Sequence, residues 1–151
     1  MAEREGGRDS RRVKVFVYYI GRAKDAHVNA VAEGYLARIA RYVPAHMAEI
    51  RPERSDLRAK HPTARKIFLD PAGQAPDSAG FAALVQKAEM EARDLVFLVG
   101  GHDGLPPGWA AQADLLFSLS RLTMPHELAR AVLLEQVYRA FATLRGHPYP
   151  R

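Results

Sequence analysis

The chain has 151 residues, no cysteine and a formal net charge of +5 at pH 7. This length suffices for one domain with a buried core, and the lack of cysteine excludes a disulfide framework, a thiolate nucleophile and a cysteine-ligated metal. The excess of lysine and arginine fits a polyanionic partner such as RNA or DNA, with ordinary solubilising charge as the alternative.

The first twelve residues are polar, contain four arginines and include no apolar core of signal-peptide length. We therefore predict a disordered basic extension at 1–12 and a single folded domain at 13–151. No apolar run approaches the roughly 20 residues that span a membrane, so the sequence predicts a cytoplasmic protein without a membrane segment. The six histidines show no close pair at metal-ligand spacing, and we expect no bound metal.

The first elements are a strand, a helix and a short strand. The sequence VKVFVYYI at 13–20 is dense in β-branched and aromatic residues, which is typical of a buried strand. Asp25 is placed to cap a helix whose apolar residues recur at helical spacing, and Pro44 is expected to stop it. Residues 48–50 predict a short strand.

A polar, basic connector follows at 51–65. It is either a face that binds RNA or a segment that is merely solvated. Its cations, with the residue after it, are Arg51, Arg54, Arg58, Lys60, Arg65 and Lys66.

The rest of the chain continues the alternation of apolar strands and helices. The expected elements are a strand at 66–69 broken by the Asp-Pro-Ala-Gly sequence at 70–73, a helix from Ser78, strands at 95–99 and 113–119, and a helix from Pro125 to about Arg145. Strands that are apolar on both faces favour a parallel sheet. The predicted fold is α/β, with a parallel sheet covered by helices on both faces.

The last helix is apolar over more than half of its circumference, because Leu134 and Tyr138 lie off its main apolar stripe. Such a helix needs two packing partners. One is its own sheet, and the second is a second subunit on a two-fold axis or, alternatively, the interior of a monomer. Gln136 lies within the stripe and is expected to find a hydrogen bond there.

Two segments are candidates for ligand binding. Gly100-Gly101 follows a strand, where a nucleotide would approach the carboxyl end of a parallel sheet, although a tight turn that needs glycine explains the pair as well. The run from Leu119 to Met124 offers backbone amides and carbonyls between apolar side chains, which suits an adenine ring. Its alternative is a loop before a helix, with Thr123 near the N-cap.

Three further residues are candidates at the end of the chain. His126 lies at a helix start and either contacts a ligand or is structural. Tyr149 and Arg151 follow the last helix and suit stacking on a base and contact with phosphate, unless the terminus is simply frayed. A serine hydrolase is not supported, since no nucleophile elbow surrounds Ser118 or Ser120.

The order GG-x-x-GL, SLS-x-LT-x-PH-x-LAR-x-x-L-x-EQ-x-YRA and then PY occurs at 100–105, 118–140 and 148–149. In this order the chain resembles the SPOUT-class methyltransferases that act on pseudouridine in large-subunit (23S) rRNA. The resemblance implies a homodimer with a C-terminal trefoil knot. It further implies transfer of a methyl group from S-adenosylmethionine to N3 of a pseudouridine, on assembled ribosomes.

The resemblance also implies which residues form the site. The matching cofactor-binding residues are Leu69, Gly100, Leu119, Ser120, Arg121, Leu122, Thr123 and Met124, and the matching catalytic positions are His126, Tyr149 and Arg151. In such dimers the tail of one subunit borders the pocket of the other. This chain departs from the family pattern at Pro150, where a histidine is usual, and in a connector after Ile50 that is shorter than usual.

Two alternatives to an active methyltransferase remain from the sequence. One is a non-catalytic RNA- or ribosome-binding relative with the same fold, which the change at Pro150 favours and the intact run 119–124 opposes. The other is an unrelated α/β enzyme that binds a phosphate-bearing nucleotide on an unknotted sheet.

Overall fold

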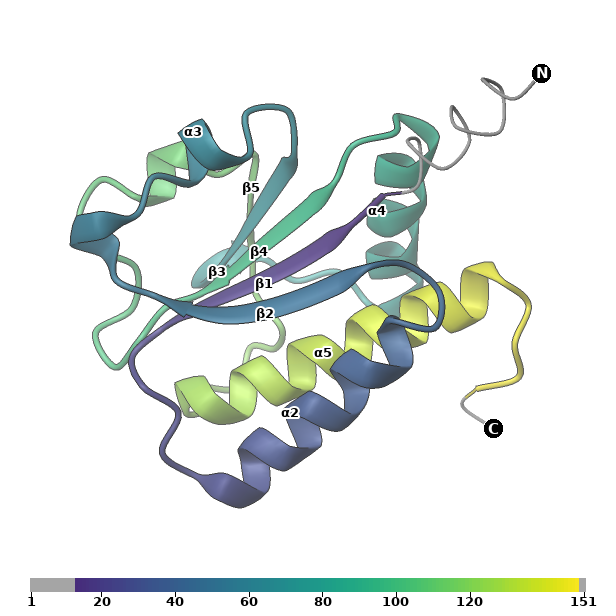
Figure 1. Cartoon of the computed structure of the whole chain (residues 1–151), viewed down its shortest axis with the longest axis horizontal. Helices are drawn as coiled ribbons and strands as arrows, with labels where there is room; N and C mark the ends of the chain where they lie inside the picture. Colours follow the sequence, from purple (N-terminus) through teal and green to yellow (C-terminus); the bar gives the residue numbers. More distant parts are fainter. Residues whose placement is uncertain (1–12, 150–151) are drawn as a thin grey trace.

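A computed structural model describes residues 13–149, so the predicted extension at 1–12 and the tail residues Pro150 and Arg151 lie outside the described residues. In chain order the elements are β1 (Val15–Ile20), α2 (Ala26–Ile39), β2 (Ala45–Ile50), the 3₁₀ helix η1 (Pro52–Arg54), α3 (Leu57–Lys60), β3 (Arg65–Gln74), α4 (Ser78–Met90), β4 (Leu95–Val99), the 3₁₀ helix η2 (Ala110–Gln112), β5 (Leu115–Phe117) and α5 (His126–Leu144) (Figure 1).

The five strands pair in the order β2-β1-β4-β3-β5, and every pair is parallel. This confirms the predicted parallel α/β sheet. The trefoil knot stays a prediction, and so does the domain boundary before residue 13.

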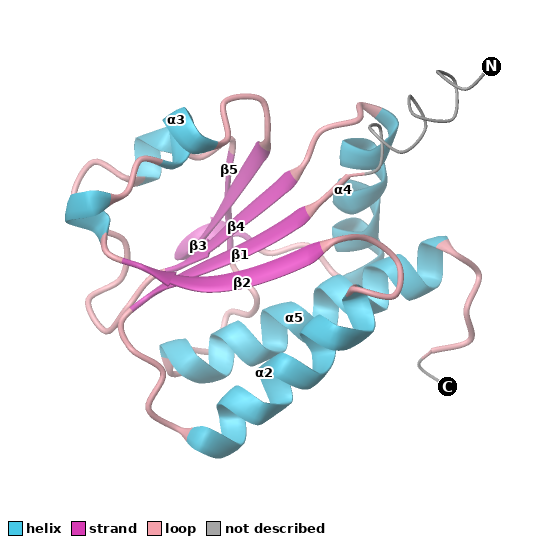
Figure 2. Ribbon diagram, in the orientation of Figure 1, coloured by secondary structure: helices cyan, strands magenta, loops and turns pink. Residues whose placement is uncertain are grey.

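The two faces of the sheet are covered unequally (Figure 2). The helices α2, α4 and α5 pack on one face, where Val15, Val17 and Phe97 join the larger core cluster. On the other face, Tyr18 and Phe68 belong to a smaller cluster that is covered by the short elements α3 and η2 and the loops around them. Helical segments thus lie on both sides, but only the first side carries long helices.

The strand predicted at 66–69 is longer than expected, and its predicted end at 70–73 is wrong. The strand β3 continues to Gln74, and both Leu69 and Gln74 pair with Phe117, so residues 70–73 form a bulge in the ladder. The side chain of Asp70 accepts a hydrogen bond from the Ala72 amide at 2.8 Å. A sequence of turn-forming residues therefore bends the strand without ending it, because β5 pairs on both sides of the bend.

Gly73 allows this bulge to pack against β5. A Cβ atom at Gly73 would lie 2.5 Å from the carbonyl carbon of Leu116 and 2.5 Å from the amide nitrogen of Phe117. Neither backbone atom can move without disturbing the ladder. We expect Gly73→Ala to lower the free energy of unfolding by about 3 kcal/mol, the upper range for overpacking, as measured by urea denaturation.

Gly34→Ala is the matched control, because nothing lies within 4 Å of a Cβ atom at this position in α2. It is expected to raise the free energy of unfolding by about 1 kcal/mol, the difference in helix propensity between alanine and glycine. Equal changes for the two variants would contradict the steric role of Gly73.

The last helix finds its second partner within the chain. The residues Leu134 and Tyr138, which lie off the predicted stripe, are buried, and Tyr138 packs against Tyr35 of α2 with ring centroids 6.0 Å apart. Gln136 finds its predicted hydrogen bond, since its Oε1 accepts from Ser78 Oγ at 2.9 Å. The breadth of the apolar surface therefore does not by itself require a second subunit.

Two smaller predictions about helix ends are corrected. The helix α2 ends at Ile39 and not at Pro44, because a turn follows in which the amides of Tyr42 and Val43 both bond to the carbonyl of Ile39. The N-cap of α5 is Pro125 and not Thr123, and no side chain caps it. Among residues 13–149, no helix is long and apolar enough to cross a membrane, and no group of side chains suited to hold a metal is found.

Candidate functional site

A cavity of about 930 Å³ lies at one edge of the sheet. It lies at the bulge of β3 and at the ends of β4 and β5, since Leu69, Val99 and Phe117 line it together with the first residue of α5, His126. The carboxyl ends of parallel strands are the usual place for a ligand in such sheets. The predicted cofactor-binding residues Leu69 and Gly100 line this cavity.

The loop after β4 is a tight turn built on close contact between glycines. The amide of Gly104 donates to the carbonyl oxygen of Gly101 at 2.9 Å, and Gly104 has a φ of +80°. Gly100 needs no unusual φ; a Cβ atom there would lie 2.6 Å from the carbonyl carbon of Gly104. Gly100 is therefore required by the close approach of backbone, and the turn that it allows forms one wall of the cavity.

The run from Leu119 to Met124 lines the same cavity. The hydroxyl of Ser118 donates to the carbonyl oxygen of Ser120 at 2.7 Å, and the hydroxyl of Ser120 accepts from the Leu122 amide at 2.9 Å. The two serines hold the loop shape, as expected of side chains that compete for backbone groups. The side chain of Leu122 is left 79% exposed beside the cavity.

Glu127 fixes the start of α5 against the loop after β1. Its Oε1 accepts from the amides of Lys24 and Asp25, each at 3.0 Å. These bonds lower the pKa of Glu127, the bond from Asp25 most strongly, because they favour the carboxylate. The neighbouring His126 is thereby held at the edge of the cavity.

The tail residue Tyr149 lies away from this cavity. Its hydroxyl donates to Glu135 Oε2 at 2.8 Å, in the middle of α5, and its ring packs on Tyr138 with centroids 4.7 Å apart. Arg139 binds the same carboxylate of Glu135, with Nη2 at 2.6 Å. Burial and then hydrogen bonds with Tyr35 and Glu135 raise the pKa of Tyr149, so its phenol stays protonated at neutral pH.

The structure therefore gathers most of the predicted site residues and separates others. Within one cavity it brings together Leu69, Gly100, Leu119, Ser120, Arg121, Leu122, Thr123, Met124 and His126. Tyr149 does not line this cavity in its own chain, and Arg151 lies outside the described residues. Sequence reasoning did not single out Asp70 and Asp103 as lining residues, although Asp70 begins the bulge of β3 and Asp103 lies in the turn after β4.

Comparison with known proteins gives a consistent result. The family model described as "Predicted SPOUT methyltransferase" matches residues 13–150. The protein named Ribosomal RNA large subunit methyltransferase H from Solibacter usitatus (strain Ellin6076) is 68% identical over 139 residues, which are 92% of this chain and 100% of the relative. Its namesake from Sorangium cellulosum (strain So ce56) is 43% identical over 143 residues, 91% of this chain and 99% of the relative.

A solved structure shares the fold at low sequence identity. The probable methyltransferase from Bordetella pertussis Tohama I matches with a TM-score of 0.54 and 11% identity, over 87% of this chain and 98% of the other. At this identity the likeness concerns the fold alone.

Proposed function

The chain belongs to the SPOUT methyltransferase family, and we propose that it transfers a methyl group from S-adenosylmethionine to N3 of a pseudouridine in large-subunit (23S) rRNA. The proposed substrate follows the names of the relatives, which call them large-subunit ribosomal RNA methyltransferases. The observation that carries the proposal is that every predicted cofactor-binding residue lines one cavity, at the bulge of β3 and the ends of β4 and β5. The expected setting is the ribosome in the cytoplasm.

The residues around the cavity fit S-adenosylmethionine. The cavity of about 930 Å³ is wide enough for this molecule with a base beside it. Backbone groups of the run 119–124 suit the adenine ring, and the carboxylates of Asp70 and Asp103 suit the cationic part of the molecule. When bound, S-adenosylmethionine supplies a methyl group that is already activated on a sulfonium, so the protein mainly has to align it.

The protein must also help the imide N3 to lose its proton. His126 is the candidate for receiving or relaying that proton, because it lines the cavity. Tyr149 is not a base in this scheme, since burial and its hydrogen bonds raise its pKa. Its one hydroxyl proton is donated to Glu135, so its part is to position the target base through its ring. Arg151 would stabilise the developing negative charge.

Because Tyr149 does not reach the cavity of its own chain, the proposal includes a homodimer in which each tail completes the partner's site. Two exposed apolar side chains support it: Leu122, which lines the cavity, is 79% exposed, and Leu128, on the first turn of α5, is 43% exposed. Homodimer interfaces are more apolar than the rest of a protein surface, so a dimer would bury both side chains.

We therefore expect the protein to sediment as a dimer of 16.8 kDa chains at about 10 µM. Leu128→Glu is expected to shift it toward the monomer by placing a charge in the interface. Met90→Glu is the matched control, because Met90 is 79% exposed at the end of α4 and does not line the cavity. A wild-type protein that sediments as a monomer would remove the composite site.

The function is tested by two measurements on the wild-type protein. Calorimetric titration with S-adenosylmethionine is expected to give micromolar binding. Transfer of the labelled methyl group to ribosomes and to free large subunits, followed by mass spectrometry of the digested rRNA, is expected to yield N3-methylpseudouridine. Ribosome binding without transfer would instead indicate the non-catalytic relative, and preference for a phosphate-bearing nucleotide would indicate an unrelated activity.

A further inference from the structure

The second face of the sheet carries a row of aromatic rings at its β2 edge. Phe16 of β1 stacks on His46 of β2, with ring centroids 5.2 Å apart and planes at 20°. Along β1, Phe16 and Tyr18 are parallel to within 7° at 6.2 Å. His61 closes the row from the connector, since its Nε2 lies 2.7 Å from the Tyr18 hydroxyl.

One end of this row is open to solvent. The side chain of His46 is exposed and that of Phe16 is half-buried, whereas Tyr18 is only 5% exposed. No long helix covers this face, so the outer ring of the row presents a flat surface to an incoming group (Figure 2). A flat ring at an open sheet face suits a stacked base.

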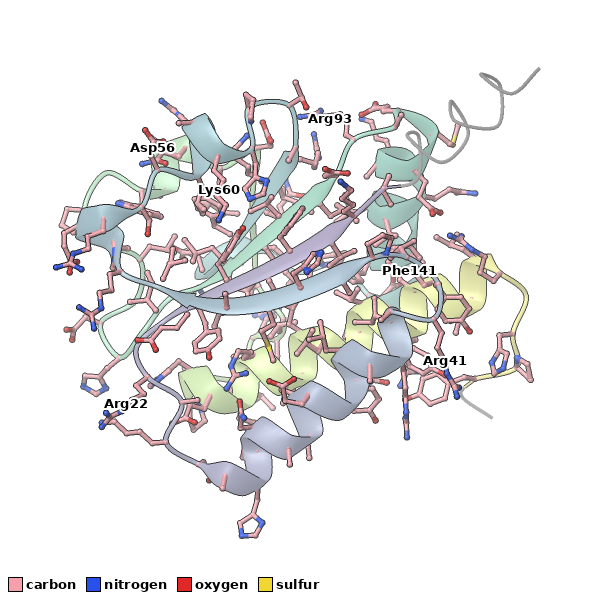
Figure 3. The ribbon with its side chains drawn as sticks, in the orientation of Figure 1. Arg22, Arg41, Asp56, Lys60, Arg93 and Phe141 are labelled. Atoms are coloured by element: carbon pink, nitrogen blue, oxygen red, sulfur yellow. The ribbon has the colours of Figure 1, made fainter. Side chains whose placement is uncertain are left out.

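A separate hollow of about 390 Å³ adjoins the buried end of the row. Tyr18 and Ile50 line it from the sheet, and Arg54 and Lys60 line it from the connector. The ammonium of Lys60 lies 5.6 Å from the centre of the Tyr18 ring. Figure 3 shows Lys60 above the sheet, on the side opposite α2 and α5. This hollow shares no lining residue with the cavity at the bulge of β3 and the ends of β4 and β5.

The side chains around the hollow carry an excess of positive charge that other residues do not neutralise. The cations Arg51, Arg54 and Lys60 are exposed, and none of them forms an ion pair with another residue of the described part, 13–149. Asp56 is the one carboxylate that lines the hollow, and it is already used as the N-cap of α3, where it accepts from the Ala59 amide at 3.1 Å. The other carboxylate of the connector is Glu53, which is exposed.

We propose that this face is a second RNA-binding site, in which a base of single-stranded RNA stacks on His46, whose ring is backed by Phe16, while Arg54 and Lys60 bind the adjoining phosphates. The inference rests on the proposed function, because it assigns these residues a contact with the RNA substrate away from the site of methyl transfer. A chain of this size has little surface with which to select one nucleotide in a ribosome. A second contact, on the sheet face that α3 covers, would increase the affinity for the RNA substrate without changing the rate of methyl transfer.

Rings together with unpaired cations favour RNA over the other possible partners. A protein partner would need carboxylates placed opposite Arg51, Arg54 and Lys60. A nucleic acid supplies both bases that stack on rings and regularly spaced phosphates that pair with cations. Duplex RNA offers few exposed base faces, so the expected ligand is a single-stranded or looped segment.

The test uses the full-length protein and a fluorescein-labelled oligouridylate of about 10 nucleotides, within the site size of single-strand binders. We compare the wild type with Arg54→Gln/Lys60→Gln, with His46→Ala and with the control Lys87→Gln/Arg41→Gln. The control removes two exposed cations from α4 and from the turn after α2, both on the other face.

The double variant at the connector is expected to bind oligouridylate roughly 25-fold more weakly at 0.1 M salt, because each neutralised phosphate contact contributes a salt slope of about 0.7. Its salt slope falls by about 1.4, and the control keeps the wild-type slope. His46→Ala weakens binding about fivefold with an unchanged slope, since stacking does not depend on charge. In methyl transfer, the double variant raises KM for large subunits and leaves kcat and the affinity for S-adenosylmethionine unchanged.

Several results would overturn the inference. One is a wild type that does not bind oligouridylate, and another is an equal loss in the connector variant and the control. If the connector variant bound oligouridylate normally but ribosomal subunits weakly, the contact would be with ribosomal protein; if it lost its dimer, the face would hold a second copy. A wild type that transfers no methyl group would defeat the proposed function, while the oligouridylate measurement would still decide this inference.

Discussion

Gly100→Ala and Gly100→Val are both expected to weaken binding of S-adenosylmethionine at least 100-fold. The reason is the same for the two variants, because the first added carbon already lies 2.6 Å from the carbonyl carbon and 2.8 Å from the carbonyl oxygen of Gly104. The turn 100–104 has to move, and with it one wall of the cavity. Moving the residues that hold a ligand by about 1 Å lowers activity roughly 100-fold.

The fold is expected to survive these substitutions. Gly100 follows the last residue of β4, Val99, and its clash is confined to the turn, so the sheet ladder up to Val99 is left intact. The measurements are calorimetric titration with S-adenosylmethionine and circular dichroism. Gly34→Val is the control, since nothing lies within 4 Å of a Cβ atom there. Unchanged affinity in Gly100→Ala would take the turn out of the cofactor site.

Local patterns predicted the elements that border the site. The strand predicted at 95–99 has the bounds of β4, and the helix predicted from Pro125 to about Arg145 differs from α5 by one residue at each end. Both predictions succeed because their signals are strong. An apolar run followed by two glycines indicates the end of a strand, and a proline before a long stretch of helical periodicity indicates the start of a helix.

Long-range pairing decided the elements that the sequence missed. The turn-forming residues 70–73 predicted the end of a strand, but β5 pairs with β3 on both sides of the bulge. The polar connector predicted no regular structure, yet Asp56 caps the one-turn helix α3 and Leu57 is 1% exposed beneath it. A helix of one turn leaves little trace in a sequence. Here the only signals are a possible capping residue, Asp56, and one apolar residue, Leu57, within a basic segment.

The sequence did not predict where the tail after α5 lies. Gly146 has a φ of +73°, and the amide of His147 donates to the carbonyl oxygen of Ala142 at 2.8 Å, so the chain reverses directly after α5. A glycine just past a helix predicts such an ending. What it does not predict is the far contact that the reversal allows, in which Tyr149 meets Glu135.

Removal of residues 148–151 is expected to lower methyl transfer about 10³-fold, because by the proposed function Tyr149 positions the target base and Arg151 stabilises its anion. Stability is expected to fall by only about 1–2 kcal/mol, the loss of a half-buried ring on Tyr138 and one hydrogen bond to Glu135. Tyr149→Phe removes the hydroxyl alone and is expected to reduce kcat about tenfold. His147→Ala is the matched control, since its exposed side chain lies in the same tail.

Combining the truncated chain with Gly100→Val separates a composite site from a site within one chain. Each variant alone is expected to be inactive, the first for lack of a tail and the second for lack of a cavity that binds cofactor. In a mixed dimer, the intact tail of the Gly100→Val chain completes the intact cavity of the truncated chain. Co-expression at equal amounts is therefore expected to restore about a quarter of wild-type activity, since half of the dimers are mixed and each holds one competent site. If each tail served the cavity of its own chain, no combination of the two variants would regain activity.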